Sequence, residues 1–221
     1  MTTDFSYDVV IVGGGINGAG IARDAALRGL RVAVLEQADW CYGTSRWSSR
    51  LIHGGLRYLE HFEIGLVRES LHEREVLLQV AAHLVKPLPL MVPLYREARR
   101  GRRTVAAGMW LYDLLSWGKS LPRHRMLDAA EALRLAPGLQ AAGLDGAAQY
   151  YDAQVAFPER LVLENLLAAR ASGADLFSYH RVDRILSNAG QVVGVRDRVA
   201  AVRAVAVVVD GSGRLAAIGG R

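Results

Sequence analysis

The chain has 221 residues, a hydrophobic fraction of 51% and a net charge of +5 from 27 basic and 22 acidic residues. These values exclude a disordered chain and allow one large core or two smaller ones. The single cysteine, Cys41, excludes an intrachain disulfide and a multi-cysteine metal cluster. We expect neither a signal peptide nor a spanning helix, because the first residues lack a basic start and no apolar run approaches about 18 residues.

A strand, a helix and a second strand are predicted at the start of the chain. Residues 7–12 form an apolar run with several β-branched side chains, as buried parallel strands do. Apolar residues at near-helical spacing follow the next glycines, and Gly29 is the predicted helix stop. Residues 31–36 are predicted as the second strand. Residues 40–58 are rich in Gly, Ser and Arg, show little periodicity and predict a long functional loop.

The middle of the chain is predicted to combine helices with a proline-containing strand. Helical spacing recurs over 62–84 and 104–117, and a short helix is predicted over 127–135. Residues 86–95 have a strand-like pattern that includes three prolines. Because proline cannot donate to a hydrogen-bonded ladder, this pattern predicts a strand at the edge of a sheet.

The last part of the chain is predicted to be rich in strands. A strand is expected over 147–155, followed by a helix over 158–174 that Pro158 opens. Four further strands are expected over 175–180, 182–187, 191–196 and 202–210. The first three of these would form a β-meander, and the last would be a return strand.

Gly13, Gly15 and Gly18 form a G-x-G-x-x-G motif between the first strand and the first helix. The first glycine permits a tight turn, the second lets the backbone approach a pyrophosphate, and the third allows close helix–strand packing. The helix N-terminus then presents N–H groups to the phosphates. Glu36 ends the second strand and can accept hydrogen bonds from a ribose hydroxyl. These features predict dinucleotide binding; the alternative is an ordinary βαβ turn with a surface glutamate.

The order of the later elements favours FAD over a nicotinamide dinucleotide. A nicotinamide-binding domain usually continues with further βαβ units, whereas here a long loop follows the second strand. The β-meander and the return strand would provide the additional binding surface that an extended FAD molecule needs. The return strand leads into DGSG at 210–213, whose small residues would let the backbone pass close to the flavin.

An arginine-rich segment precedes the helix predicted over 104–117. Its arginines are Arg96, Arg99, Arg100, Arg102 and Arg103. The helix is apolar on almost every side but too short to span a bilayer. Residues 96–119 are therefore predicted to lie on a membrane surface, with Trp110, Tyr112 and Trp117 at the interface. The alternative is a buried core helix beside a solvated basic face. Nucleic acid is not a predicted partner, because no recognition fold accompanies the arginines.

Three segments of the chain resemble one known family. Their sequences are IVGGGINGAGIARDAALRGL, TSRWSSRLIHGGLRYLEH and LVRESLHEREVLL. They are similar to the FAD-dependent glycerol-3-phosphate dehydrogenases of the D-amino-acid-oxidase-like flavoprotein group, and the resemblance runs from residue 7 to about residue 213. It implies an α/β fold with a Rossmann-like FAD-binding βαβ domain, a β-meander and part of a second domain. The FAD-binding domain would comprise 1–84 and 170–221, and the partial substrate- or membrane-facing region 85–169.

The resemblance also implies which residues lie along FAD. Contacts with the pyrophosphate and the ribityl chain would come from Gly13, Gly15, Asn17, Gly18, Thr44, Ser45, Ser48 and Ser49. The residues placed against or near the flavin ring would be His53, Gly54, Gly55 and Gly213. Glu36 would bind the adenosine ribose, and Val182 would cover the adenine through its backbone.

Arg57 and Tyr58 would reach the substrate side, because a guanidinium matches a phosphate and a phenol can bond a hydroxyl. The implied reaction oxidises sn-glycerol 3-phosphate to dihydroxyacetone phosphate, passes electrons to a quinone and uses His53 as the base. For His53 the alternative is a structural histidine bonded to nearby backbone. For Arg57 it is a surface ion pair with Glu60 or Glu63.

The remaining expectations concern location, partners and completeness. The resemblance implies a protein in the cytoplasm, peripheral on the cytoplasmic membrane; a homodimer is a further expectation, and no metal site is predicted. Members of the family are considerably longer, so the chain is expected to be an N-terminal fragment. DGSG also departs from the family's usual Asn-Ala-x-Gly. The alternatives are a flavoenzyme of the same group that acts on an amino acid, and an inactive truncation product.

Overall fold

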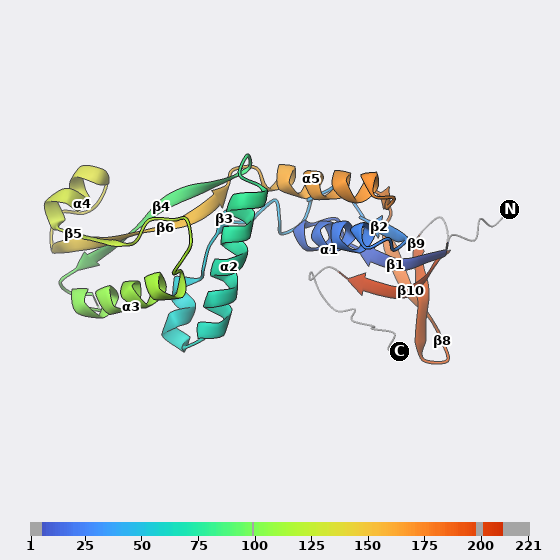
Figure 1. Cartoon of the computed structure of the whole chain (residues 1–221), viewed down its shortest axis with the longest axis horizontal. Coiled ribbons are helices and arrows are strands. Elements are labelled where there is room, and N and C mark those ends of the chain that lie inside the picture. The colour runs from blue at the N-terminus through green and yellow to red at the C-terminus, as the bar shows by residue number, and fades with distance from the viewer. Residues whose placement is uncertain (1–5, 99, 198–200, 210–221) are drawn as a thin grey trace. The chain divides into compact units, whose positions relative to one another are not determined.

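The computed structural model describes residues 6–98, 100–197 and 201–209 (Figure 1). The chain forms two compact units, each with its own sheet. Unit 1 comprises residues 1–49 and 157–221, and unit 2 comprises residues 50–156. The mixed α/β fold with a parallel Rossmann-like sheet confirms the predicted fold class.

The unit bounds differ from the predicted domain ranges at two places. Residues 50–84, which were predicted in the FAD-binding domain, belong to unit 2. The reason is that helix α2 (Ile64–Val80) packs on the strands of that unit. Residues 157–169 belong to unit 1, because helix α5 (Pro158–Ala171) packs against helix α1 (Ile16–Leu27).

Unit 1 is built on a six-stranded sheet. Its strands, in the order β7-β2-β1-β10-β9-β8, are β7 (Asp175–Phe177), β2 (Val32–Leu35), β1 (Ser6–Val12), β10 (Ala201–Val209), β9 (Gln191–Asp197) and β8 (Val182–Asn188). Strand β1 is central and pairs in parallel with both β2 and β10. The sheet therefore brings the carboxyl ends of β1 and β2 to one edge, where the glycine motif and Glu36 lie.

The predicted β-meander over 175–196 is partly wrong. Strand β7 does not pair with β8; it pairs in parallel with β2 at the edge of the sheet. Helix α5 precedes it and packs beside α1, so the chain returns to the sheet in the direction of β2. The antiparallel meander consists of β8, β9 and β10.

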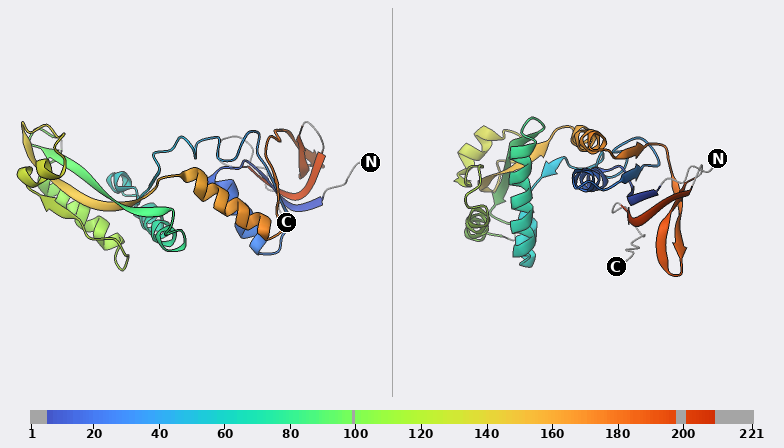
Figure 2. Two further views of the ribbon diagram at one scale, coloured as in Figure 1. Left: turned by 90° about the horizontal axis from the view of Figure 1, so that it is seen from above. Right: turned by 45° about the vertical axis from the view of Figure 1, so that its right-hand side comes forward.

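Helices α1 and α5 lie side by side on one face of this sheet (Figure 2). Their contact is close because α1 presents small buried side chains to it. The core on this face consists of Ile11, Ala19, Ala22, Ala25, Ala26, Val32, Val34, Cys41, Val162, Leu166, Ala169 and Ala174. Burying this apolar surface stabilises the unit by about 25 cal/mol for each Å² removed from water.

Unit 2 is built on the long strand β6 (Leu144–Val155). Strand β4 (Val85–Tyr95) pairs with it antiparallel along its length, and β3 (Leu51–Ile52) and β5 (Arg125–Leu127) also pair with it. Strand β4 has β6 as its neighbour in the sheet, which confirms the predicted edge strand. Its prolines are at residues 87, 89 and 93, so their ring nitrogens, which cannot donate a hydrogen bond, all point to the same side of the strand.

The helices of unit 2 are α2, α3 (Arg102–Leu115), α4 (Ala129–Leu135) and the short 3₁₀ helix η1 (Leu56–His61). The predicted loop over 40–58 thus contains β3 and the start of η1. Helix α3 buries Met109 and Tyr112 on one side and exposes Trp110 and Leu114 on the other. It is therefore neither a fully buried core helix nor a helix with all its aromatic residues at the surface.

Candidate cofactor and substrate sites

The turn after β1 requires glycine at two positions. Gly13 has a φ of 114°, which side-chain-bearing residues rarely adopt, and its N–H donates to the carbonyl oxygen of Leu35 at 2.8 Å. A Cβ atom on Gly18 would collide with the carbonyl oxygen of Gly13. Gly15 caps α1 without a side chain. The motif thus brings α1 close to the end of β1, which is the close packing that the sequence predicted for the third glycine.

Some of the predicted pyrophosphate residues lie at the N-terminus of α1. Ser45 reaches this end of the helix, where its Oγ accepts a hydrogen bond from the N–H of Ile16 at 3.0 Å. Ser48 donates to the carbonyl oxygen of Ser45 at 3.1 Å, and Asn17 is exposed in the first turn. Thr44 and Ser49 are exposed on the same loop. The first turn of α1 carries no acidic residue, so its electrostatics favour an anion.

Glu36 has a role that the sequence did not predict. Its side chain is almost fully buried, with 8% exposed. One carboxylate oxygen accepts a hydrogen bond from Gly14 N at 2.8 Å, and the other accepts one from Ala38 N at 3.0 Å. The carboxylate therefore holds the glycine turn in place. Because an ionised carboxylate offers about four acceptor positions, capacity remains for ribose hydroxyls.

Gly14 and Trp40 were missed by the sequence predictions. A Cβ atom on Gly14 would lie 2.5 Å from Trp40 Cε3, so the indole packs directly on the turn. Cys41 N also donates to the carbonyl oxygen of Gly14 at 3.0 Å. The run of three glycines indicates that another group packs closely on the turn. Sequence alone could not show that this group is Trp40, which is 26 residues from Gly14 along the chain.

A cavity of about 460 Å³ lies beyond Glu36 in unit 1. It is lined by Gln37, Ala38, Tyr42, Tyr179, His180, Arg181 and Asp197. His180 N donates to the carbonyl oxygen of Glu36 at 2.8 Å, which ties the approach to β8 to the end of β2. Val182 begins β8 directly after the cavity-lining Arg181, and its side chain packs into the core. Gly213 lies outside the described residues.

In unit 2, a cavity of about 470 Å³ gathers several of the predicted site residues. Its lining comprises Leu51, His53, Gly55, Leu56, Tyr58, His61, Leu90, Tyr150 and Asp152. Gly55 has a φ of 69°, and a Cβ atom there would collide with the Tyr58 ring. None of the described residues forms a hydrogen bond with the His53 ring, which leaves it available to the cavity. The side chains of Arg57 and Glu60 lie outside the described residues.

Gly54 is buried beneath this cavity and bonded to a network that the sequence predictions missed. Its N–H is shared between the Tyr112 hydroxyl at 3.1 Å and Asp152 Oδ1 at 3.2 Å. Arg74 Nη1 donates to the same carboxylate oxygen at 2.5 Å. An aspartate within a predicted strand and an arginine in the EREVLL segment are visible in the sequence, but no local pattern indicates that the two residues pair.

The prediction that Tyr112 lies at a membrane interface is wrong. Its side chain is 2% exposed, and its hydroxyl donates to Asp152 Oδ1 at 2.8 Å. Burial, together with the charge of Asp152, raises the pKa of the Tyr112 hydroxyl, so the residue stays neutral. The physical reason is helical spacing: Tyr112 follows Met109 by three residues and shares its buried face.

Comparison with known proteins identifies the family. The family described as FAD dependent oxidoreductase matches residues 8–217, which is nearly the whole chain. The chain belongs to the FAD dependent oxidoreductase family. The chain is also 54% identical over 174 residues to the glycerol-3-phosphate dehydrogenase of Synechocystis sp., covering 79% of this chain and 32% of that protein.

Other relatives agree with this placement. The glycerol-3-phosphate dehydrogenase of Mycobacterium leprae is 47% identical over 193 residues, covering 87% of this chain and 33% of that protein. A solved glycerol-3-phosphate dehydrogenase from Bacillus halodurans, complexed with FAD, superposes with a TM-score of 0.67 at 27% identity, covering 92% of this chain and 34% of that one. The chain thus spans about a third of the length of these relatives.

The residues of unit 1 fit the cofactor of an FAD dependent oxidoreductase. Gly13 and Gly18 form a turn that a Cβ atom would block, and the first turn of α1 carries no acidic residue. Ser45 supplies a hydroxyl at this helix end. Glu36 has hydrogen-bond acceptor positions left over, and the next two residues, Gln37 and Ala38, line the cavity of unit 1. The pyrophosphate and ribose of FAD would be held by these groups.

Proposed function

We propose that the chain binds FAD through unit 1 and serves the oxidation of sn-glycerol 3-phosphate to dihydroxyacetone phosphate, with a quinone as electron acceptor. The observation that carries this proposal is the 47–54% identity, over 79–87% of the chain, to proteins named glycerol-3-phosphate dehydrogenase. The glycine turn, the α1 N-terminus and Glu36 support the cofactor part. The relatives' names support the substrate.

The cavity of unit 2 supplies groups of the right chemistry for a phosphorylated polyol. FAD, when bound, accepts the two electrons of an alcohol oxidation as a hydride. The His53 imidazole lines the cavity and can take the proton of the C2 hydroxyl. The Tyr58 phenol, in the same lining, can bond a hydroxyl or a phosphate oxygen. The Arg57 guanidinium, one residue earlier in the chain, is the proposed phosphate partner.

The substrate assignment is tested by flavin reduction. The purified chain is loaded with FAD, made anaerobic and mixed with sn-glycerol 3-phosphate; we expect the visible absorption band of the bound flavin to bleach. Glycine and D-alanine are the matched comparisons, and they should leave the band unchanged. Bleaching by the amino acids alone would show that the chain belongs to an amino-acid-oxidising branch. Failure to take up FAD would contradict the cofactor proposal for this chain.

We further propose that the chain is cytoplasmic and that α3 attaches it to a membrane surface. None of the described helices is long and apolar enough to cross a bilayer. The exposed side of α3 and the residue segment after it nevertheless carry Trp110, Leu111, Leu114 and Trp117, with the two tryptophans 61% and 72% exposed. Arg103 is exposed in the first turn of α3, and the Arg123 guanidinium lies 5.1 Å from the Trp117 ring centroid. Exposed indoles beside arginines suit the headgroup region of an anionic membrane.

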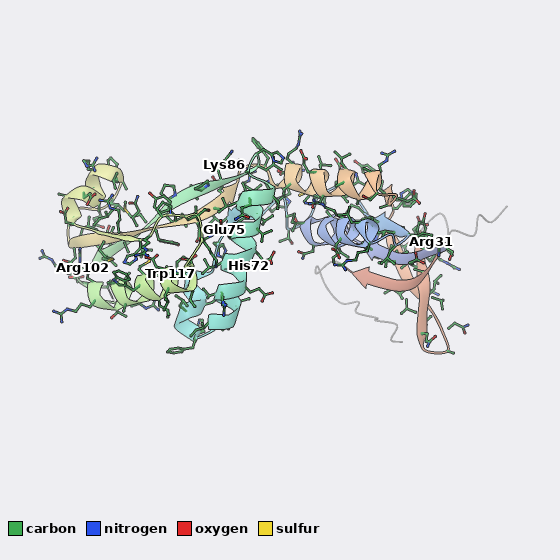
Figure 3. The ribbon with its side chains drawn as sticks, in the orientation of Figure 1. Arg31, His72, Glu75, Lys86, Arg102 and Trp117 are labelled. Atoms are coloured by element: carbon green, nitrogen blue, oxygen red, sulfur yellow. The ribbon has the colours of Figure 1, made fainter. Side chains whose placement is uncertain are left out.

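The basic segment contributes less to this surface than its composition suggests. Arg102, labelled in Figure 3, was counted among the headgroup-binding arginines, but its Nη1 donates to the carbonyl oxygens of Leu127 at 3.1 Å and Asp145 at 2.9 Å. It therefore ties α3 to strand β5 and to β6. Arg99 lies outside the described residues.

Liposome flotation tests the membrane proposal. The wild-type chain should float with vesicles containing phosphatidylserine, and Trp110→Glu should reduce the floating fraction several-fold, because the substitution places a charge where the indole would insert. Trp47→Glu is the matched control: Trp47 is 77% exposed but lies in unit 1, so flotation should persist. Equal flotation of all three proteins, or of none, would contradict the proposal.

A further inference from the structure

Three side chains from three elements of unit 2 form one buried polar cluster. Arg74 comes from α2, Tyr112 from α3 and Asp152 from β6. Both charged side chains are only 1% exposed. Asp152 Oδ1 accepts hydrogen bonds from Arg74 Nη1 at 2.5 Å and from the Tyr112 hydroxyl at 2.8 Å. Charges are rarely buried to this extent, so the pair calls for a purpose beyond packing.

The cluster converges on a backbone group that has no regular secondary structure. Gly54 lies between β3 and η1, where neither a strand ladder nor a helix supplies a partner for its N–H. Its hydrogen bonds go instead to the Tyr112 hydroxyl and Asp152 Oδ1. A Cβ atom on Gly54 would collide with Leu71 and lie 2.5 Å from the Tyr112 hydroxyl. Leu71 and the Tyr112 hydroxyl therefore leave no room for a side chain at residue 54.

The same cluster also holds the part of β6 that lines the cavity. Arg74 Nη1 donates to the carbonyl oxygen of Tyr151 at 3.2 Å. Tyr151 lies between Tyr150 and Asp152, which both line the cavity that contains His53. The Arg74 guanidinium therefore contacts β6 twice, at the Tyr151 carbonyl oxygen and at the Asp152 carboxylate. The same carboxylate accepts the hydrogen bond from Gly54 N, which lies in the segment 53–55.

We propose that Arg74, Tyr112 and Asp152 are positioning residues that fix the Gly54 backbone and thereby set the place of His53 and Gly55 in the cavity. Arg74 and Tyr112 act on the site through Gly54 and are not expected to touch the substrate. Asp152 also lines the cavity, so the tests of the positioning role use Tyr112. The effect of this placement on oxidation rests on the proposed function. The placement itself is independent of that function and can be measured without cofactor or substrate.

The first test is amide hydrogen exchange of Gly54 in the purified chain, followed by NMR. Tyr112→Phe removes one of the two acceptors of this N–H, and we expect Gly54 to exchange about tenfold faster, which corresponds to a net hydrogen bond of about 1.4 kcal/mol. Tyr150→Phe is the matched control, because its ring packs edge-on against Tyr112 but it lines the cavity without bonding to Gly54. Unchanged exchange at Gly54 in folded Tyr112→Phe, or equal acceleration in the control, would overturn the proposal.

The second test asks whether the position affects the reaction. In the FAD-loaded chain, Tyr112→Phe should slow flavin reduction by glycerol 3-phosphate about tenfold. The FAD dissociation constant should change by much less than the rate, since the predicted pyrophosphate and ribose contacts of unit 1 are intact. Faster exchange at Gly54 with an unchanged reduction rate would overturn the positioning role. If the wild-type chain is not reduced at all, the proposed function fails, and the exchange result alone decides whether the cluster places Gly54.

Discussion

Asp152→Ala is expected to lower the free energy of unfolding by about 3–5 kcal/mol. The substitution removes the carboxylate that accepts hydrogen bonds from Arg74, Tyr112 and Gly54, all of which are buried. The cost is largest for Arg74, because its charged side chain is only 1% exposed and its Nε has no hydrogen-bond partner among the residues that the structure describes. Urea denaturation followed by circular dichroism would measure the change.

Asp145→Ala is the matched control for this prediction. Asp145 lies in the same strand, β6, but its side chain is exposed, so its removal should change the free energy of unfolding by less than about 0.5 kcal/mol. A loss below about 1 kcal/mol for Asp152→Ala would show that water or a rearranged side chain compensates Arg74. The ion pair would then not be a main support of unit 2.

Gly18→Ala is expected to weaken FAD binding by about 100-fold and to destabilise unit 1 by about 1–3 kcal/mol. The added methyl group would collide with the carbonyl oxygen of Gly13 and would also lie 3.3 Å from Ile11 Cγ2. Neither neighbour can yield cheaply, since one is backbone and the other belongs to a fully buried side chain. The turn must therefore shift away from the N-terminus of α1. Fluorescence titration with FAD and thermal unfolding would report the two effects.

Gly20→Ala offers a control with the same chemical change on the same helix. Apart from its chain neighbours and the nearby backbone of its own helix, no heavy atom of the described residues lies within 4 Å of a Cβ built on Gly20. Because alanine favours helix over glycine by about 1 kcal/mol, this variant should be slightly more stable than the wild type and should bind FAD equally well. If both variants lost FAD to the same degree, the cause would be a general change in α1 and the close approach at Gly18 would not be responsible.

Several features were predictable because they depend on residues close together in the sequence. The run at 7–12, the glycine motif and the run at 31–36 predicted β1, α1 and β2 to within a few residues. Proline at residues 87, 89 and 93 predicted an edge strand, since each residue lacks the N–H that a second neighbouring strand would need. Backbone conformation and periodicity of this kind are local properties.

Other features depended on which distant segments meet. Strand β7 was expected in a meander, yet it pairs in parallel with β2, more than a hundred residues earlier in the chain. Tyr112 was expected at a surface, yet it faces Asp152, which is 40 residues away. An aromatic residue in an apolar helix has the same local pattern in both situations, and only the packing of the helix decides between them.

The sequence by itself determined the βαβ turn, the acidic end of β2 and the family of flavoproteins to which the chain belongs. Tertiary structure alone decided that Glu36 holds Gly14 and that Arg74, 78 residues from Asp152, helps to fix Gly54. The physical reason is that a turn is specified by the φ and side-chain volume of a few neighbours. A buried charge, in contrast, must take its partner from whatever segment the fold brings within hydrogen-bonding distance.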